Sequence, residues 1–114
     1  MRYTLLGNSG LRVSDVALGT MTFGTDWGWG ASKSESAKQF ELFAAAGGTF
    51  VDTANRYTNG SAESILGELV AADRDHFVIG TKYSLNMRQQ CAARVPARLP
   101  GRGRLHPRWH VRPP

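Results

Sequence analysis

Cysteine is nearly absent from this chain of 114 residues. Cys91 is the only one, so no disulfide bond can form within the sequence and no cluster of thiolate metal ligands is available. Apolar runs are also short. None approaches the roughly 18 residues of a membrane-spanning helix, and residues 1–7 lack the apolar core of a signal peptide. We therefore expect a cytoplasmic protein with no membrane partner.

Acidic residues and prolines are each missing from one part of the chain. Residues 1–87 hold seven Lys/Arg and all nine Asp/Glu, a net charge of −2, whereas residues 88–114 hold seven Arg and no acid, a net charge of +7. All five prolines lie in the second part. The total charge of +5 therefore belongs to the tail. We expect a folded region at 1–87 and a basic Arg/Pro-rich tail, irregular or disordered, at 88–114.

Two interpretations of the tail stay open. Arg, Pro, Ala and Gly, which GC-rich codons encode, make up 17 of its 27 residues, as expected of a shifted reading frame. Residues 101–104 (Gly-Arg-Gly-Arg) are instead typical of basic arms that bind single-stranded nucleic acid. Such an arm would bind polyanions weakly and without specificity, so we expect no specific nucleic-acid partner. His106 and His110 are separated by Pro107 and have no third ligand nearby, so we expect no metal site.

Strand and helix patterns alternate along residues 1–87. Strands at 3–6 and 11–13 flank residues 7–10 (Gly-Asn-Ser-Gly), which suit a tight hairpin turn. Ser32 and Glu35 have the spacing of a capping box at the start of a helix, and Gly47-Gly48 would end that helix. We therefore predict a helix between the capping box and the two glycines. The remaining elements predicted from the pattern are buried strands at 16–20 and 49–52, a helix at 61–72 and a third strand at 77–81.

The order of these elements predicts the fold class. Strands that alternate with helices form parallel pairs through right-handed crossovers, with the helices outside the sheet. Both a (β/α)8 barrel and an open doubly wound sheet fit this order. The turn at 19–24 is neither G-x-G-x-x-G nor a phosphate-binding loop, so we favour the barrel. We predict an α/β fold that is part of a (β/α)8 TIM barrel: an N-terminal β-hairpin, about three strands and two helices.

Polar residues follow two of the predicted strands. Asp52 ends one strand, Tyr57 lies five residues later, and Lys82 ends the next strand, thirty residues after Asp52. Asp52 alone could be an ordinary loop-capping acid. One βα unit separates it from Lys82, however, which places both at the same mouth of a barrel. An ammonium close to a phenol favours the phenolate and makes Tyr57 a better proton donor, while Asp52 balances the lysine charge.

The chain resembles the aldo-keto reductases over residues 1 to about 87. The resemblance rests on Gly19-Thr20-Met21, the Asp52-Thr53-Ala54-x-x-Tyr57 motif, Thr81-Lys82, the hairpin residues 6–14, and Glu63 with Leu66, Gly67 and Leu69. It implies an oxidoreductase that reduces a small-molecule aldehyde or ketone with NADPH, or alternatively NADH, and uses no metal. Tyr57 would be the general acid, Lys82 the group that tunes it, and Asp52 the partner of Lys82.

The resemblance also implies roles in binding. Gly19, Thr20, Met21 and Asp52 would bind the cofactor beside its nicotinamide. Trp27 or Trp29 would line the substrate pocket, although aromatic residues in a glycine-rich loop can also simply anchor it.

Several parts of such an enzyme are missing from the sequence pattern. The resemblance implies a histidine after a fourth strand and cofactor-binding loops in the second half of the barrel. A complete barrel takes about 250 residues and eight strands, whereas about three strands are predicted here. We therefore expect a truncated reductase that is inactive as this chain. A non-catalytic fragment or a nucleotide-sensing subunit is the alternative, and the oligomeric state stays open.

Overall fold

The computed structural model describes residues 1–83 of the chain. The predicted tail from residue 88 therefore lies outside the described residues, together with Cys91, the Gly-Arg segment at 101–104, His106 and His110.

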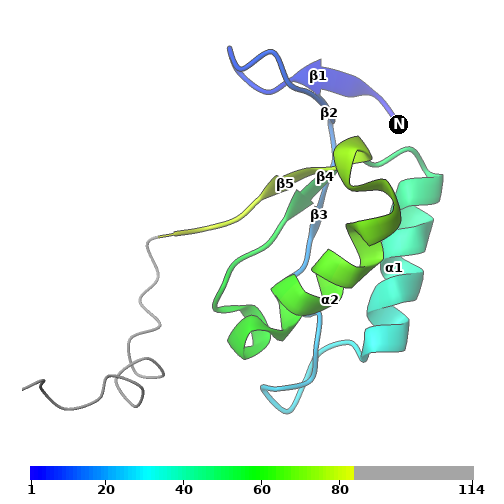
Figure 1. Ribbon diagram of the computed structural model, residues 1–114. Helices are drawn as coiled ribbons and strands as arrows, with labels where there is room; N and C mark the ends of the chain where they lie inside the picture. The colour runs from blue at the N-terminus through cyan, green and yellow to red at the C-terminus, as the bar shows by residue number, and fades with distance from the viewer. Residues whose placement is uncertain (84–114) are drawn as a thin grey trace, which may run out of the picture.

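The chain begins with the predicted β-hairpin. Strands β1 (Tyr3–Leu5) and β2 (Arg12–Ser14) pair antiparallel, with Thr4 opposite Val13. Gly7 and Gly10 take positive φ angles of 55° and 78° in the turn, which glycine adopts without steric cost. The hairpin lies beyond the amino-terminal ends of the other strands (Figure 1). The Ser14 hydroxyl attaches it there, because it accepts hydrogen bonds from the N–H groups of Thr49 and Phe50.

Three parallel strands form the second sheet. They are β3 (Ala17–Gly19), β4 (Phe50–Asp52) and β5 (Val78–Gly80), in the order β3-β4-β5. The register places Asp52 between Gly19 and Gly80. Val51 at the centre of β4 is fully buried, as expected for a strand with a neighbour on each side.

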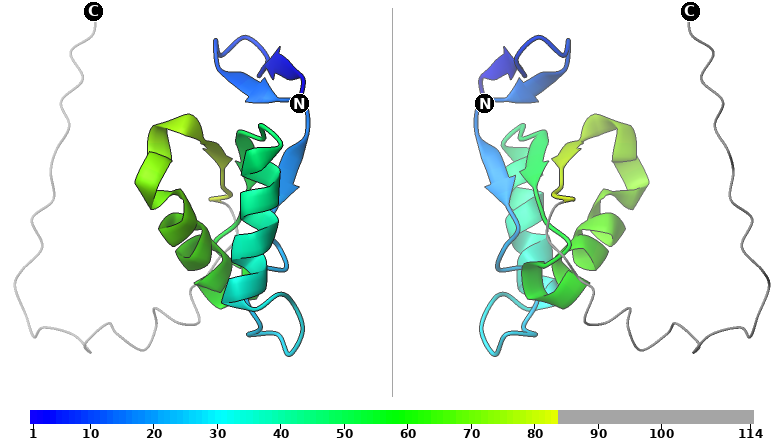
Figure 2. Two further views of the ribbon diagram at one scale, coloured as in Figure 1. Left: turned by 90° about the vertical axis from the view of Figure 1, so that its right-hand side faces the viewer. Right: turned by 90° about the vertical axis from the view of Figure 1, so that its left-hand side faces the viewer.

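One expectation about this sheet is wrong. The strand at 16–20 was predicted to be buried on both faces, yet Val16 is 55% exposed, Ala17 and Gly19 are exposed, and Leu18 is half-buried. Two features of the structure expose it: both helices lie on the same side of the sheet (Figures 1 and 2), and within residues 1–83 β3 is paired on one side only. An apolar run can indicate a strand, but its burial depends on which neighbours cover it.

Helix α1 (Lys33–Ala45) begins and ends as predicted. Ser32 and Glu35 form the capping box, and the hydroxyl and N–H of Ser32 hold the pKa of Glu35 below its usual value. At the other end, the N–H of Gly47 donates to Ala44 and that of Gly48 to Phe43. These two bonds make a Schellman motif, in which Gly47 has the required positive φ of 86°.

Helix α2 (Ser61–Val70) is shorter than the predicted 61–72. A kinked 3-10 segment, η2 (Ala71–His76), follows it and leads into β5. Both helices lie on the same side of the sheet (Figures 1 and 2), and an ion pair between Lys33 and Glu68 joins them. Within residues 1–83, no helix is long and apolar enough to cross a membrane.

The hydrophobic core lies between the helices and the sheet. Its larger cluster contains side chains of α1, β4 and α2 and the residue just before β5. The buried members are Phe40, Val51, Leu66, Val70 and Phe77. A second cluster fixes the loop after β3, because the fully buried Phe23 packs against Ala62 and Ile65 of α2.

Candidate active site

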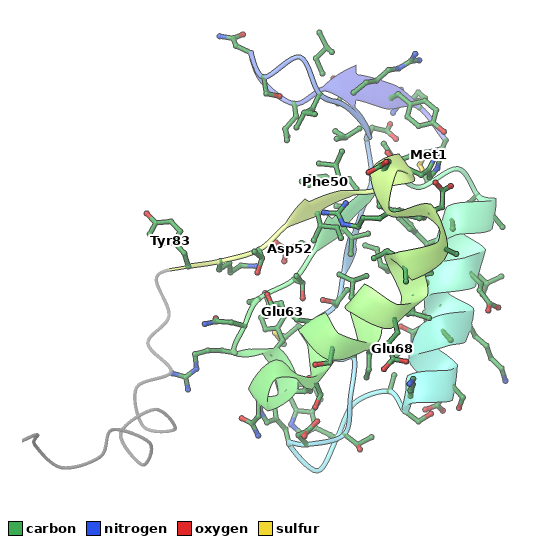
Figure 3. The ribbon with its side chains drawn as sticks, in the orientation of Figure 1. Met1, Phe50, Asp52, Glu63, Glu68 and Tyr83 are labelled. Atoms are coloured by element: carbon green, nitrogen blue, oxygen red, sulfur yellow. The ribbon has the colours of Figure 1, made fainter. Side chains whose placement is uncertain are left out.

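The carboxyl ends of the three strands carry the polar residues that the sequence indicated. Asp52 is the last residue of β4 and lies at the end of this strand that faces away from Met1 and the hairpin (Figure 3). Its backbone is held on both sides. The N–H and the hydroxyl of Thr20 both donate to the Asp52 carbonyl at 3.0 Å, and the N–H of Thr53 donates to Gly80 at 2.8 Å. The sheet therefore gives Asp52 a fixed position.

Lys82 bridges to Asp52 from beyond the end of β5. Its Nζ donates to both carboxylate oxygens, at 2.8 and 2.9 Å, and to the Thr53 carbonyl at 2.9 Å. The Asp52 carboxylate, and after it the nearby Tyr57 phenol, raise the pKa of Lys82 above the ordinary 10.5, against a smaller effect of desolvation. Lys82 is therefore a charged ammonium at neutral pH. The side chains of Lys82 and Asp52 are 38% and 47% exposed, so a ligand can reach them.

Tyr57 lies beside this pair. Its Oη is 3.5 Å from Asp52 Oδ2, longer than the usual O–H···O bond of about 2.5–3.0 Å. The centre of its half-buried ring is 4.9 Å from Lys82 Nζ. The structure thus brings together all three residues predicted to act as catalytic groups. The phenol, the ammonium and the carboxylate form one contiguous polar cluster at the mouth of the parallel strands.

Thr58 positions Tyr57, and sequence reasoning missed it. Tyr57 opens the 3-10 segment η1 (Tyr57–Gly60), in which Thr58 and Asn59 have positive φ angles of 45° and 56°, strained for residues other than glycine. The fully buried Thr58 hydroxyl donates to the Phe23 carbonyl at 2.5 Å and accepts from the N–H of Ala62 at 3.0 Å. Its bonds therefore join the loop after β3 to the first turn of α2. No local sequence signal marks this residue.

The residues predicted to bind cofactor differ in their accessibility. Gly19 is exposed, and a Cβ built on it would meet nothing within 4 Å. Met21 is 46% exposed. Thr20, in contrast, is fully buried, and its hydroxyl already donates to Asp52. Gly19 and Met21 are thus accessible to a ligand, whereas Thr20 is buried and holds Asp52 in place.

The two tryptophans pack against each other in the loop after β3. Their ring centres are 5.4 Å apart at an interplanar angle of 47°, and Trp29 is 52% exposed. Neither indole belongs to the bonded cluster around Asp52. Phe23, not a tryptophan, is the fully buried aromatic that anchors this loop. The exposed Trp29 is therefore free to contact a ligand.

His76 lies away from this cluster. It is exposed at the opposite end of β5 from Lys82, and its ring packs edge-on against Phe77 at 5.0 Å. The part of the chain that the structure describes holds no group of three His, Cys, Asp or Glu side chains able to bind a metal ion.

Sequence comparison matches this chain to known proteins. The model described as the Aldo/keto reductase family matches residues 15–99. Aldo-keto reductase ausK of Emericella nidulans is 40% identical over 93 residues, 76% of this chain and 23% of that protein. The aryl-alcohol dehydrogenase [NADP(+)] of Phanerodontia chrysosporium is 44% identical over 82 residues, 67% of this chain and 21% of that protein. The chain thus spans less than a quarter of the length of these relatives.

Solved structures give the same result. The holo form of aldo-keto reductase AKR11C1 from Bacillus halodurans superposes with a TM-score of 0.65 at 26% identity, covering 73% of this chain and 26% of that one. The expected partial (β/α)8 TIM-barrel fold is confirmed by such neighbours. Since the family match covers most of the chain, the protein belongs to the aldo/keto reductase family.

Proposed function

We propose that Asp52, Tyr57 and Lys82 are the proton-donating part of a carbonyl reductase site. The observation that carries this proposal is the position of the Lys82 ammonium, bonded to both oxygens of Asp52 and 4.9 Å from the ring centre of Tyr57. As negative charge builds on a substrate carbonyl oxygen, Tyr57 Oη donates its proton to that oxygen. The ammonium stabilises the phenolate that is left, and Asp52 keeps Lys82 charged and in place.

The residues at the strand ends fit a nicotinamide cofactor. Gly19 and Met21 expose backbone and side chain beside Asp52, with no Cβ at Gly19 to block a flat ring. They and Asp52 would hold the nicotinamide end, while Thr20 would keep Asp52 in position. Bound NADPH, with NADH as the alternative, would supply the hydride. The name of the 44% identical relative, which specifies NADP(+), supports this choice.

The substrate we propose is a small aldehyde or ketone. Trp27 and Trp29 would form one wall of its pocket, because both lie in the loop that follows β3, and Trp29 is half exposed. The names of several relatives, norsolorinic acid reductase of Aspergillus flavus among them, are those of reductases. Only part of this machinery lies in the described residues. We propose that this chain does not catalyse turnover by itself.

The cofactor part of the proposal is tested on the chain itself. NADPH is titrated against tryptophan fluorescence, and NADPH oxidation in the presence of an aldehyde is followed by absorbance. We expect binding without oxidation. That result also fits a nucleotide-sensing role, whereas oxidation would show a working reductase. If NADPH does not bind, the chain is a non-catalytic fragment and the cofactor assignment is wrong.

The proton-donor role needs a complete barrel. In a chimera, residues 15–83 replace the matching segment of the Phanerodontia chrysosporium enzyme. Tyr57→Phe is expected to lower kcat at least about 100-fold, the contribution of a general acid, while the Kd for NADPH stays unchanged. Tyr83→Phe is the control, because that side chain is 98% exposed. Equal losses in kcat and in NADPH affinity for Tyr57→Phe would contradict the role.

A further inference from the structure

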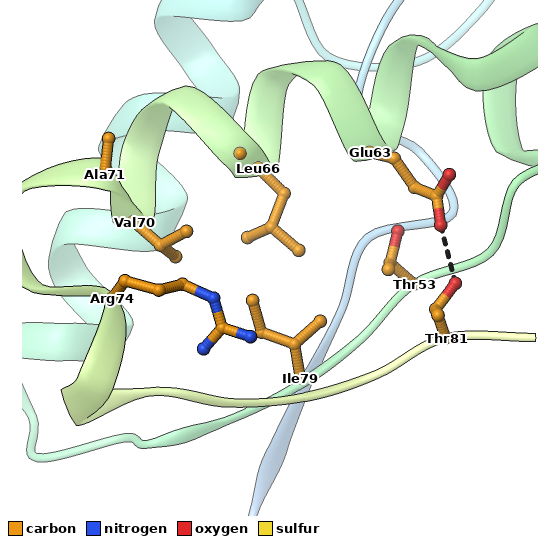
Figure 4. Close-up of a pocket in the computed structure, with 9 residues that line it drawn as sticks. Thr53, Glu63, Leu66, Val70, Ala71, Arg74, Ile79 and Thr81 are labelled. Atoms are coloured by element: carbon orange, nitrogen blue, oxygen red, sulfur yellow. Dashed lines mark hydrogen bonds between the residues drawn. The ribbon is translucent and has the colours of Figure 1, made fainter.

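Glu63 and Thr81 are bonded next to the proposed site but outside it. The Thr81 hydroxyl donates to Glu63 Oε1 at 2.6 Å, which joins α2 to the residue just before Lys82 (Figure 4). Side chains alternate along an extended segment, so neighbours point to opposite faces. Thr81 accordingly faces α2, whereas Lys82 faces Asp52. The bond between Thr81 and Glu63 thus restrains the face of this segment that points to α2. The Lys82 ammonium extends from the opposite face.

Backbone pairing ends before Lys82. Within residues 1–83, β5 is paired with β4 alone, and the N–H of Thr53 bonds to Gly80 at the end of this ladder. Beyond Gly80, the described contacts of the segment are made by side chains: Thr81 to Glu63, and Lys82 to Asp52 and the Thr53 carbonyl. An ordered side-chain contact must overcome the conformational entropy of its groups. Restraint of Thr81 therefore lowers the entropic cost of placing Lys82.

Ile79 of β5 packs against the core cluster that contains Leu66 and Val70 of α2, whereas Thr81 contacts α2 through its hydrogen bond to Glu63. A cleft of about 380 Å³ separates α2 from β5, and its floor is apolar, with Leu66, Val70 and Ile79. A hydrogen bond lies at each end of the cleft, and Figure 4 shows the one between Thr81 and Glu63. At one end Arg74 Nη1 donates to the Phe77 carbonyl at 2.8 Å, and at the other Thr81 bonds to Glu63. The end beside the proposed site is therefore fixed by a hydrogen bond instead of by close packing.

We propose that Glu63 and Thr81 are positioning residues that hold the end of β5 so that Lys82 stays bonded to Asp52 beside Tyr57. This inference rests on the proposed function of the three residues. Neither Glu63 nor Thr81 touches the reacting atoms, and both act through Lys82. Their hydrogen bond connects α2 to the proposed site.

The test measures the titration of Lys82 in the full chain without cofactor or substrate. Lys33, Lys38 and Lys82 are the lysines of the sequence, so the Lys82 side-chain ¹³C resonance can be assigned as the one lost in Lys82→Arg. Thr81→Val and Glu63→Ala remove the bond, and both are expected to shift the pKa of Lys82 downward toward its ordinary value. Thr81→Ser and Glu63→Gln keep a hydroxyl and an acceptor, and they are expected to restore most of the parent titration.

Glu68→Ala is the matched control. Glu68 lies on the same helix, but its partner is Lys33 of α1, so its removal should leave Lys82 unchanged. A melting temperature that falls in Thr81→Val while the Lys82 titration stays at its parent value would show a merely structural bond and overturn the inference. Circular dichroism verifies the fold of each variant. The measurement involves neither cofactor nor turnover, so a failure of NADPH to bind would contradict the cofactor part of the proposed function and leave this result standing.

Discussion

The hydroxyl of Thr58 offers the sharpest test of how the fold holds the candidate site. Thr58→Val keeps the shape and the branched Cβ of the side chain, so the strain of the positive φ and the packing stay the same. It removes two hydrogen bonds: the one that the hydroxyl donates to the Phe23 carbonyl and the one that it accepts from the Ala62 N–H. Phe23 and Ala62 are fully buried, and an N–H in the first turn of a helix has no partner within the helix.

The magnitude follows from these two groups. A buried donor or acceptor that loses its partner costs about 1–3 kcal/mol, so the two together cost about 2–6 kcal/mol. The total stability of a small domain is about 5–15 kcal/mol, so the change is a large fraction of it. Tyr57 precedes Thr58 directly. We therefore expect the variant to loosen the phenol as well as lower the stability.

Urea unfolding followed by circular dichroism measures the effect. Thr58→Ser is the control: it keeps the hydroxyl and loses one methyl group, which costs about 1 kcal/mol. If Thr58→Val loses less than about 1 kcal/mol, then water or a shifted backbone satisfies the two groups. The reasoning that Thr58 fixes this loop to α2 would then be refuted.

Two further predictions concern charge and backbone. Because the pKa of Lys82 is raised above 10.5, its ion pair stabilises the fold fully below about that pH, and this stabilisation is lost as the pH rises through the raised pKa. The difference in melting temperature between the parent and Lys82→Met should therefore be constant at neutral pH and shrink above 10.5; a constant difference at all pH values would contradict it. Gly67→Ala, in a helix with open space around the added Cβ, should raise the free energy of unfolding by about 0.5–1 kcal/mol. Gly47→Ala, at a φ of 86° with the Tyr3 hydroxyl 2.9 Å from the new Cβ, should instead lower it by more than about 1 kcal/mol; equal effects in thermal melts would disprove the assignment of Gly47 as the helix stop.

Local features were predictable from the sequence because their causes are local. The capping box of Ser32 and Glu35 and the stop at Gly47 involve residues within one turn of each other, so spacing alone identifies them. The shared location of Asp52 and Lys82 was also predictable. Successive parallel strands end at the same edge, and one βα unit separates these two residues.

Only the tertiary structure decided which atoms are available for chemistry. Thr20 matches the predicted cofactor motif, yet its hydroxyl is buried against Asp52, a residue distant in sequence. Thr58 bonds to Phe23, 35 positions earlier, and Thr81 to Glu63, 18 positions earlier, so neither contact leaves a periodic pattern. The exposure of β3 also depends on neighbours that the apolar run does not specify. Sequence patterns report backbone conformation and chain order, whereas burial and long-range hydrogen bonds arise only when distant segments meet.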